Sequence, residues 1–513
     1  MIDAATPASR PGSIHDAGFA TRVRNALAWR WGSQIIAQAI AWTSTIMVVR
    51  LLEPSDYGLF AMTQVVLTAL AFLNGQSFAT SLVQADHVDD RRIGQVFGLL
   101  LLLGCGLAAV QIAAAPVMAA YYREPLVADM LRIQAIIFLT VPFTSLPTEL
   151  LARRLEFRVQ GKISMAAAML SAATALGLAW WGWGVWALVY APIAGFVFRA
   201  VGLTIAARSL VKPVFDFRGA GDLVRFGGTL TLCQLAWIVQ SQSDIFIAGR
   251  AFDTHDLGLY AEALFLTLIV TGRFLPPIND VAFPAYATLH KAGKSIAPYF
   301  LRTLRTVLLV TAPVYVGLAL TSESAVLVLF GEKWVEMAPI VAGLAIAMPA
   351  MALQIVCSPA TNALGKPGIY LRNNAFGAIL FPASFLVAIH SGPQGLVHAW
   401  WFAAPTLLLW TLFNTLPQVG LKWRELLREL APVALANGLM ATAVLCSTRF
   451  LPPLSPFATL AVEGLTGAAT YVLTIRLLWP DLLAETWSML RPQPSSSPKP
   501  ADQTTSNADP SAA

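Results

Sequence analysis

Long apolar runs separated by short polar gaps constrain the fold of this chain more than any other feature of its sequence. A helix that crosses a bilayer needs about 20 apolar residues, and runs of that length recur along nearly the whole chain. Only 12% of the 513 residues are charged, whereas about 25% are charged in a typical soluble domain. The sequence therefore predicts an all-α, polytopic membrane protein with about 14 transmembrane helices. They are expected at residues 32–52, 57–82, 94–116, 128–150, 163–182, 184–207, 226–250, 257–283, 303–324, 338–361, 370–390, 395–418, 430–450 and 457–479.

The Lys and Arg residues are divided unequally between the two sides of these helices. Of the 34, 25 lie on the side that holds the N-terminus, five lie on the other side and four lie within helices. Positive residues collect in cytoplasmic loops, so both termini are expected in the cytoplasm. Residues 1–28 are polar and lack the order of a cleaved signal, so the first helix should stay in the membrane. The net charge of +6 then reflects orientation, and no nucleic-acid partner is expected.

One motif occurs twice, 200 residues apart. Residues 50–61 read RLLEPSDYGLFA and residues 250–261 read RAFDTHDLGLYA, each in a short gap between apolar runs. Six predicted helices separate the copies, so both lie on the same face with the same direction. This pattern predicts a parallel repeat, of the kind in which a transport site lies between two lobes near mid-membrane.

The repeat divides the chain into two lobes of six helices related by a pseudo-two-fold axis. The N-lobe is expected at 31–208 and the C-lobe at 209–420, with two further helices at 421–490 outside the repeat. Residues 1–30 form a cytoplasmic N-terminal segment. Residues 491–513 are rich in Pro and Ser and are expected to be a disordered cytoplasmic tail, because they cannot bury enough apolar surface to fold.

Ionisable residues inside the predicted helices are the candidates for function. An Arg at mid-bilayer costs about 2.5–3.5 kcal/mol on insertion scales and usually faces a polar cavity or a partner. In the helix at 257–283, Glu262, Arg273 and Asp280 fall within about 20° of one another at 100° per residue, and Pro276-Pro277 is expected to interrupt the backbone between the last two. The stripe could line a transport pathway or pair with another helix.

Two more polar stripes add to this prediction. Gln240 and Asp244 are spaced i and i+4 in the helix at 226–250, while Gln34 and Gln38 share a face of the helix at 32–52. Any single polar residue could instead hydrogen-bond a neighbouring helix, but the three stripes together predict a central polar cavity. The sequence predicts no catalytic residue, metal ligand or cofactor, and the four Cys residues lie in apolar runs without a CxxC pair.

Four stretches of the chain resemble the polysaccharide flippases of the multidrug/oligosaccharidyl-lipid/polysaccharide exporter (MOP) superfamily, in particular its Wzx/WzxC-like lipopolysaccharide or exopolysaccharide biosynthesis proteins. They are 50–66 (RLLEPSDYGLFAMTQVV), 151–162 (LARRLEFRVQGK), 242–263 (QSDIFIAGRAFDTHDLGLYAEA) and 276–287 (PPINDVAFPAYA). The resemblance covers roughly residues 30–418 and implies two six-helix lobes plus two added helices. It names no glycan.

The resemblance also implies a function. An undecaprenyl-diphosphate-linked oligosaccharide unit would pass from the cytoplasmic to the periplasmic leaflet of a bacterial inner membrane by alternating access. Arg273 is the first candidate for the diphosphate, and Asp244, Gln240 and Glu262 for sugar hydroxyls or a coupling cation, either a proton or sodium. Membrane lipids, a glycan polymerase and a chain-length regulator are the expected partners. The alternatives are another exporter of the superfamily, a membrane polymerase or ligase, and a scaffold for glycan assembly.

Overall fold

The computed structural model describes residues 32, 36–73, 90–154, 156–209, 211–215, 221–450 and 454–480, with side chains left out at 90, 92 and 221–234. Within these residues the chain is helical, and ten stretches are long and apolar enough to span a membrane. One of the ten, Pro367–Val419, contains two helices, and the apolar helix Ile36–Leu51 is shorter. The predicted all-α membrane fold is confirmed, whereas the count of 14 stays a prediction.

The N-lobe begins with the helix Ile36–Leu51 and continues through seven further helices. These are α2 (Pro54–Ala71), α4 (Asp90–Tyr122), α5 (Leu126–Gln134), α6 (Ile136–Leu139), α7 (Val141–Arg153), α8 (Phe157–Trp180) and α9 (Val185–Ala207). Helices α8 and α9 are antiparallel neighbours, joined by a tight turn in which Gly182 and Gly184 have φ of +77° and +54°. Only glycine adopts such angles readily.

The span predicted at 128–150 corresponds to one apolar stretch, Leu126–Arg153, which the structure divides into α5, α6 and α7. Proline explains the second break: Pro142 has no N–H to donate to the carbonyl of Phe138, so the helical ladder is interrupted there. Pro147 frees the carbonyl of Phe143 in the same way, and the Thr204 hydroxyl of α9 donates a hydrogen bond to it at 3.1 Å. The freed backbone is thus satisfied by a neighbouring helix, as a membrane interior requires.

The C-lobe contains seven α-helices and two short 3-10 helices. They are α10 (Gly221–Ala251), α11 (Thr254–Lys291), α12 (Ala297–Leu320), α13 (Ser322–Leu329), η1 (Glu332–Met337), α14 (Ala338–Ala363), α15 (Pro367–Ala388), η2 (Ile389–Ser391) and α16 (Gly392–Val419). Helix α11 has 38 residues, a length of about 57 Å at 1.5 Å per residue, so it exceeds the roughly 30 Å hydrocarbon core. It continues through Pro276 and Pro277, and the expected interruption at these prolines is therefore wrong.

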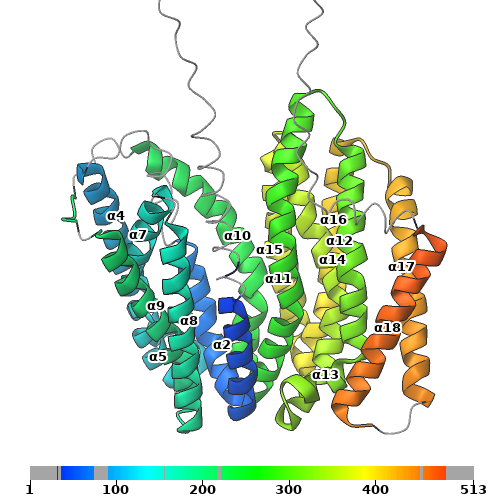
Figure 1. Ribbon diagram of the computed structural model, residues 1–513, viewed down its shortest axis with the longest axis horizontal. Helices are drawn as coiled ribbons and strands as arrows, with labels where there is room; N and C mark the ends of the chain where they lie inside the picture. The colour runs from blue at the N-terminus through cyan, green and yellow to red at the C-terminus, as the bar shows by residue number, and fades with distance from the viewer. Residues whose placement is uncertain are drawn as a thin grey trace, which may run out of the picture.

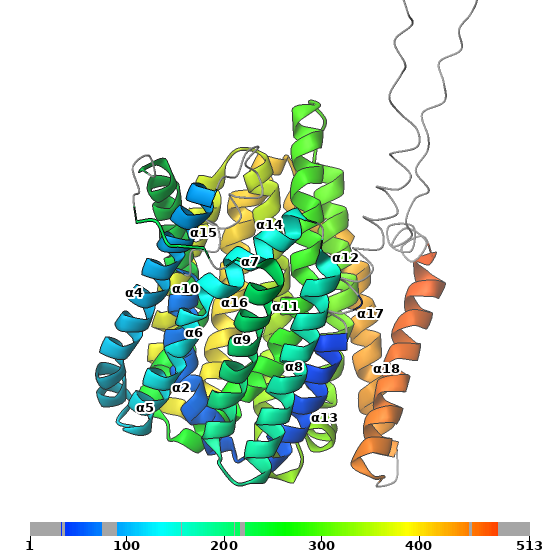
Figure 2. The same cartoon turned by 60° about the vertical axis from the view of Figure 1, so that its left-hand side comes forward.

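Two further helices, α17 (Trp423–Phe450) and α18 (Pro456–Leu478), lie at one edge of the molecule beside α12 and α13 (Figures 1 and 2). Leu309 and Ala312 of α12 form a buried apolar cluster with residues from both helices. The Tyr471 hydroxyl donates a hydrogen bond to the Leu309 carbonyl at 2.8 Å. These contacts attach α17 and α18 to the C-lobe.

Most of the C-lobe meets the N-lobe at one end of the helices, whereas α10 runs beside the N-lobe toward the other end, where Trp237 packs edge to face on Phe72 at 5.0 Å (Figure 1). The most extensive contact between them joins α2 to α11, with smaller contacts of α10 to α2 and α4. Both principal helices begin at the first of these ends with a capped first turn. Glu53 and Asp56 form a capping box at the start of α2, and the Asp253 carboxylate accepts the Asp256 N–H at the start of α11. Acidic caps of this kind satisfy the exposed N–H groups of a first turn.

Candidate functional site

The two copies of the repeated motif pack against each other where α2 crosses α11. A Cβ atom added at Gly58 would lie 1.9 Å from the carbonyl oxygen of Thr254, and one added at Gly258 would lie 1.8 Å from that of Pro54. Pro54 and Thr254 are themselves equivalent positions of the repeat, so the contact is two-fold symmetric. Small residues allow such close backbone approach between membrane helices.

The arginine that opens each motif reaches into the opposite lobe. Arg50 donates hydrogen bonds to the carbonyls of Val328 and Leu329, at the end of α13. Arg250 donates to the carbonyl of Tyr121, at the end of α4, and its guanidinium lies 5.6 Å from the Tyr121 ring centroid. Arg50 of the N-lobe thus contacts backbone carbonyls of the C-lobe, and Arg250 of the C-lobe contacts a backbone carbonyl of the N-lobe.

Further contacts join α2 and the helix before it to η1 of the C-lobe. The Lys333 ammonium lies 2.7 Å from the Glu53 carboxylate, and the Trp334 indole donates to the Val49 carbonyl at 3.0 Å. The Tyr57 and Trp334 rings pack edge to face at 5.3 Å. We call this contact the lobe interface; it comprises residues 48–62, 121–122, 248–260 and 328–334.

Asp56 connects the lobe interface to the rest of the N-lobe. Its carboxylate accepts the N–H of Val185, the first residue of α9, at 2.9 Å and the N–H of Glu53 at 3.1 Å. Helix α9 is thereby capped by a residue of the motif itself, which explains why the motif contains an acid at this position in the first copy.

Asp244, predicted to line a cavity, is instead held inside the C-lobe. Asp244 is 1% exposed. Its carboxylate accepts hydrogen bonds from the Tyr260 hydroxyl at 3.0 Å and from the backbone N–H of Ile245 at 2.8 Å. The Tyr260 hydroxyl in turn accepts the Trp400 indole N–H at 2.9 Å. The resulting chain links α10, α11 and α16 immediately behind the lobe interface.

Gln240 and Glu262 carry polar atoms that have no partner among the described residues. The Gln240 carbonyl oxygen is buried against Gly377 of α15, where an added Cβ would lie 2.1 Å from it. Glu262 is half-buried, and one of its carboxylate oxygens is buried without a hydrogen bond among the described residues. Gln240 thus lies in the protein interior between α10 and α15, whereas Glu262 is only partly enclosed.

Arg273 and Asp280 lie on the part of α11 that extends away from the lobe interface. Both side chains are exposed, and within the described part of the chain neither makes a hydrogen bond or ion pair. The stripe predicted along α11 therefore changes environment along its length, from half-buried at Glu262 to exposed at Arg273. Gln38 is half-buried on the helix Ile36–Leu51, and Gln34 lies outside the described residues.

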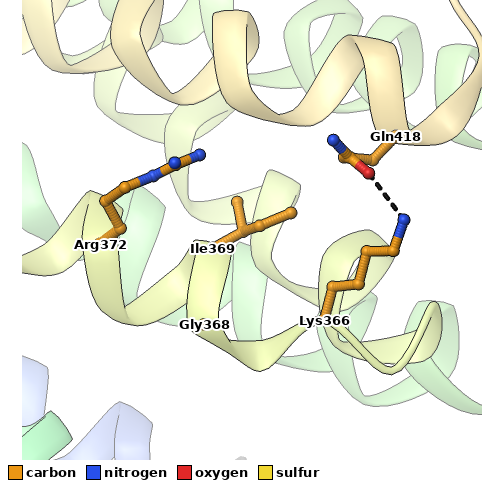
Figure 3. A pocket seen from close by; sticks show the side chains of 5 residues that line it. All are labelled: Lys366, Gly368, Ile369, Arg372 and Gln418. Atoms are coloured by element: carbon orange, nitrogen blue, oxygen red, sulfur yellow. Dashed lines mark hydrogen bonds between the residues drawn. The ribbon is translucent and has the colours of Figure 1, made fainter.

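A pocket of about 380 Å³ opens between the start of α15 and the end of α16 (Figure 3). Its lining residues are Lys366, Gly368, Ile369, Arg372 and Gln418. The Lys366 ammonium donates to the Gln418 side-chain oxygen at 2.7 Å, and Arg372 donates to the Asn414 side-chain oxygen at 2.6 Å. The Asn414 amide then donates to the Asn373 side-chain oxygen at 3.0 Å.

Comparison with known proteins identifies the family. The family described as "Polysaccharide biosynthesis protein" matches residues 47–339, which is more than half of the chain. The chain belongs to the polysaccharide biosynthesis protein family. Among relatives of this family member, the teichuronic acid biosynthesis protein TuaB of Bacillus subtilis (strain 168) is 23% identical over 431 residues, covering 79% of this chain and 85% of TuaB. The succinoglycan biosynthesis transport protein ExoT of Rhizobium meliloti (strain 1021) is 25% identical over 405 residues, covering 79% and 80%.

The fold of this polysaccharide biosynthesis protein matches that of a solved flippase. The structure of the lipid II flippase MurJ in an inward closed conformation matches with a TM-score of 0.71, over 88% of this chain and 99% of MurJ, at 12% identity. At that identity the likeness shows the fold alone. The predicted resemblance to the polysaccharide flippases is confirmed by the family match and by this fold.

Several residues at the site of this polysaccharide biosynthesis protein were not singled out by sequence reasoning. The repeat marked Arg50 and Arg250 as equivalent, but their carbonyl partners are separated from them by 278 and 129 residues and could not be inferred. Tyr260 and Trp400 look like ordinary apolar-helix aromatics. Asn373 and Asn414 alone carried a sequence signal for their contact, since polar amides inside apolar runs commonly hydrogen-bond another helix.

Proposed function

We propose that this protein is a flippase that moves undecaprenyl-diphosphate-linked oligosaccharide repeat units from the cytoplasmic to the periplasmic leaflet. The observation that carries the proposal is the lobe interface, a two-fold contact at one end of two helical lobes. Its hydrogen bonds are few and largely at exposed residues. A contact with few polar links can break and re-form, as alternating access requires, although opening it would also expose apolar residues that the two lobes bury against each other, such as Val49, Tyr57 and Tyr260.

The excess of positive residues at the opposite end supports the orientation. Because Lys and Arg collect in cytoplasmic loops, the lobe interface would close the periplasmic face, leaving the other ends of the lobes toward the cytoplasm. A glycan headgroup is too polar to cross bare hydrocarbon, whereas its polyprenyl tail can remain in the lipid. In that cytoplasm-facing state Arg273 of α11 would contact the diphosphate; its exposure, and the lack of a carboxylate partner within the described residues, support this role.

The proposed role is transport and not catalysis, and the membrane is the bacterial inner membrane. The relatives TuaB and ExoT are described as a teichuronic acid biosynthesis protein and a succinoglycan biosynthesis transport protein, which supports a polysaccharide precursor as the substrate. A glycan polymerase and a chain-length regulator are the further partners we propose, to be sought by co-purification with the tagged full-length chain.

The deciding experiment locates the lipid-linked units in cells that lack the gene. Complete units confined to the cytoplasmic leaflet, together with loss of polymer, are the expected result. Units that accumulate on the periplasmic face would indicate a polymerase or ligase instead. Normal polymer, with altered sensitivity to small molecules, would indicate another type of exporter.

A second experiment tests alternating access directly. Cysteines replacing Glu53 and Lys333, whose side chains meet across the lobe interface, can be joined by a short bismaleimide. We expect the joined protein to lose export while the unjoined double variant retains it. Full export by the joined protein would refute an opening of this interface during transport.

A further inference from the structure

The pocket between α15 and α16 contains two positive charges that no carboxylate neutralises. Its five lining residues include Lys366 and Arg372 but no Asp or Glu. Among the described residues the partners of both cations are neutral amide oxygens, from Gln418 and Asn414. The pocket therefore retains the full charge of both side chains.

A second pocket of the same lobe provides the contrast. It has a volume of about 340 Å³ and is lined by Pro298, Tyr299, Arg302, Arg305 and Glu429. There Arg305 forms an ion pair with Glu429, which is the usual way to compensate a partly buried arginine. The lack of an acid is thus specific to the lining of the α15–α16 pocket, because the other pocket of this lobe includes Glu429.

The Arg372 guanidinium is held in place by a chain of amides. Asn414 accepts from Arg372 and donates to Asn373, and both asparagines are buried, at 8% and 4% exposure. Figure 3 shows Arg372 and Lys366 extending from α15 toward α16 on either side of Ile369. One hydrogen bond to Asn414 uses only one of the five guanidinium N–H donors, so the remaining donors are available to a ligand.

The pocket has room for a group between the two cations. A Cβ added at Gly368, between them in sequence, would meet no atom within 4 Å. The pocket also lies at the first turn of α15, where the helix dipole favours negative charge. Two cations, free donors and open space are the elements that bind phosphoryl oxygens.

We propose that the α15–α16 pocket binds a phosphoryl anion, at the end of the C-lobe opposite the lobe interface. The anion is either the phosphate of a lipid headgroup at the membrane surface or a phosphate or diphosphate from solution. This site is separate from Arg273 on α11, and the proposal does not rest on the transport function proposed above.

The test uses the full-length protein in nanodiscs of phosphatidylcholine, titrated calorimetrically with inorganic pyrophosphate. Lys366→Gln with Arg372→Gln should raise the pyrophosphate Kd about tenfold or more, since each charge-assisted hydrogen bond removed contributes substantially. The matched control, Lys291→Gln with Lys294→Gln, removes two exposed charges from the same end and should leave the Kd within about twofold. Equal losses in both double variants would overturn the proposal, because the effect would then be one of overall charge.

Two more variants distinguish a loss of the binding site from a loss of the protein's folding. Gly368→Leu should fill the open space and weaken binding while both cations remain. Lys366→Arg with Arg372→Lys should retain binding, which shows that the glutamine variants lose charge and not structure. Retained binding in Gly368→Leu would overturn the assignment of the anion to this pocket.

A lipid arm distinguishes the two sources of the anion. Native mass spectrometry from nanodiscs containing phosphatidylglycerol should show lipid retained by the wild type and lost in the glutamine double variant if the headgroup is the ligand. Retention of lipid without pyrophosphate binding assigns the site to headgroups, and pyrophosphate binding without retained lipid assigns it to soluble anions. Neither response in the wild type would refute the proposal.

Discussion

Replacing Gly58 by Ala should open the lobe interface. The added methyl group would lie 1.9 Å from the Thr254 carbonyl oxygen, against an ordinary contact distance of at least 3.4 Å, so α2 and α11 must move apart by about 1.5 Å. Overpacking of this kind costs roughly 1–3 kcal/mol. Because the cost falls only on the state in which the lobes touch, the ratio of closed to open molecules should fall by about 5-fold to 150-fold.

The assay is a distance measurement between spin labels at Glu53 and Lys333, which meet across the interface. Gly58→Ala should increase the fraction of long distances, and Gly258→Ala, where the contact is 1.8 Å, should do the same. The double variant should cost less than the sum, since both methyl groups enter one crossing. Gly272→Ala is the control, as its added Cβ on the same α11 meets nothing within 4 Å. Identical distance distributions for Gly58→Ala and Gly272→Ala would refute the close crossing.

Three further predictions concern single side chains. Arg250→Gln should weaken the lobe interface by about 0.5–1.5 kcal/mol through loss of the Tyr121 contact, read as a smaller shift in the same spin-label distances; an unchanged distribution would exclude a role in closure. Tyr260→Phe should lower the thermal stability of the purified protein by about 1–3 kcal/mol, because Asp244 loses a buried donor; Tyr299→Phe, at an exposed tyrosine, is its control, and equal melting temperatures would contradict the network. Arg273→Ala should abolish glycan export at unchanged protein level and stability, since Arg273 has no hydrogen bond to lose within the described residues, whereas undiminished export would remove it from the substrate path.

The apolar runs and the repeat were sufficient to predict the membrane fold, because the length of a crossing and the period of a duplication are properties of the sequence itself. The partners of the repeat were not predictable. That Gly58 lies against Gly258 depends on how two distant helices cross.

The polar residues show the same limit at the level of the site. Helical periodicity predicts that Glu262, Arg273 and Asp280 share one face of α11, but periodicity does not say what that face contacts along the length of the helix. Glu262 is half-buried, whereas Arg273, eleven residues further along the same helix, is exposed. Asp244 could not be separated from a cavity residue without knowing that Tyr260 and Trp400 would enclose it.

The symmetric crossing at Gly58 and Gly258 has the form of an isologous dimer interface, in which one surface is complementary to itself. In a true homodimer every substitution appears on both sides at once. Fusion of the two halves into a single chain removes that restriction, so one half can change while the contact keeps its geometry. The positions equivalent to Glu262, Arg273 and Asp280 are Met62, Leu73 and Thr80. Within a single chain, the C-lobe can therefore carry charged residues at positions where the N-lobe has uncharged ones, while both lobes still form the symmetric contact.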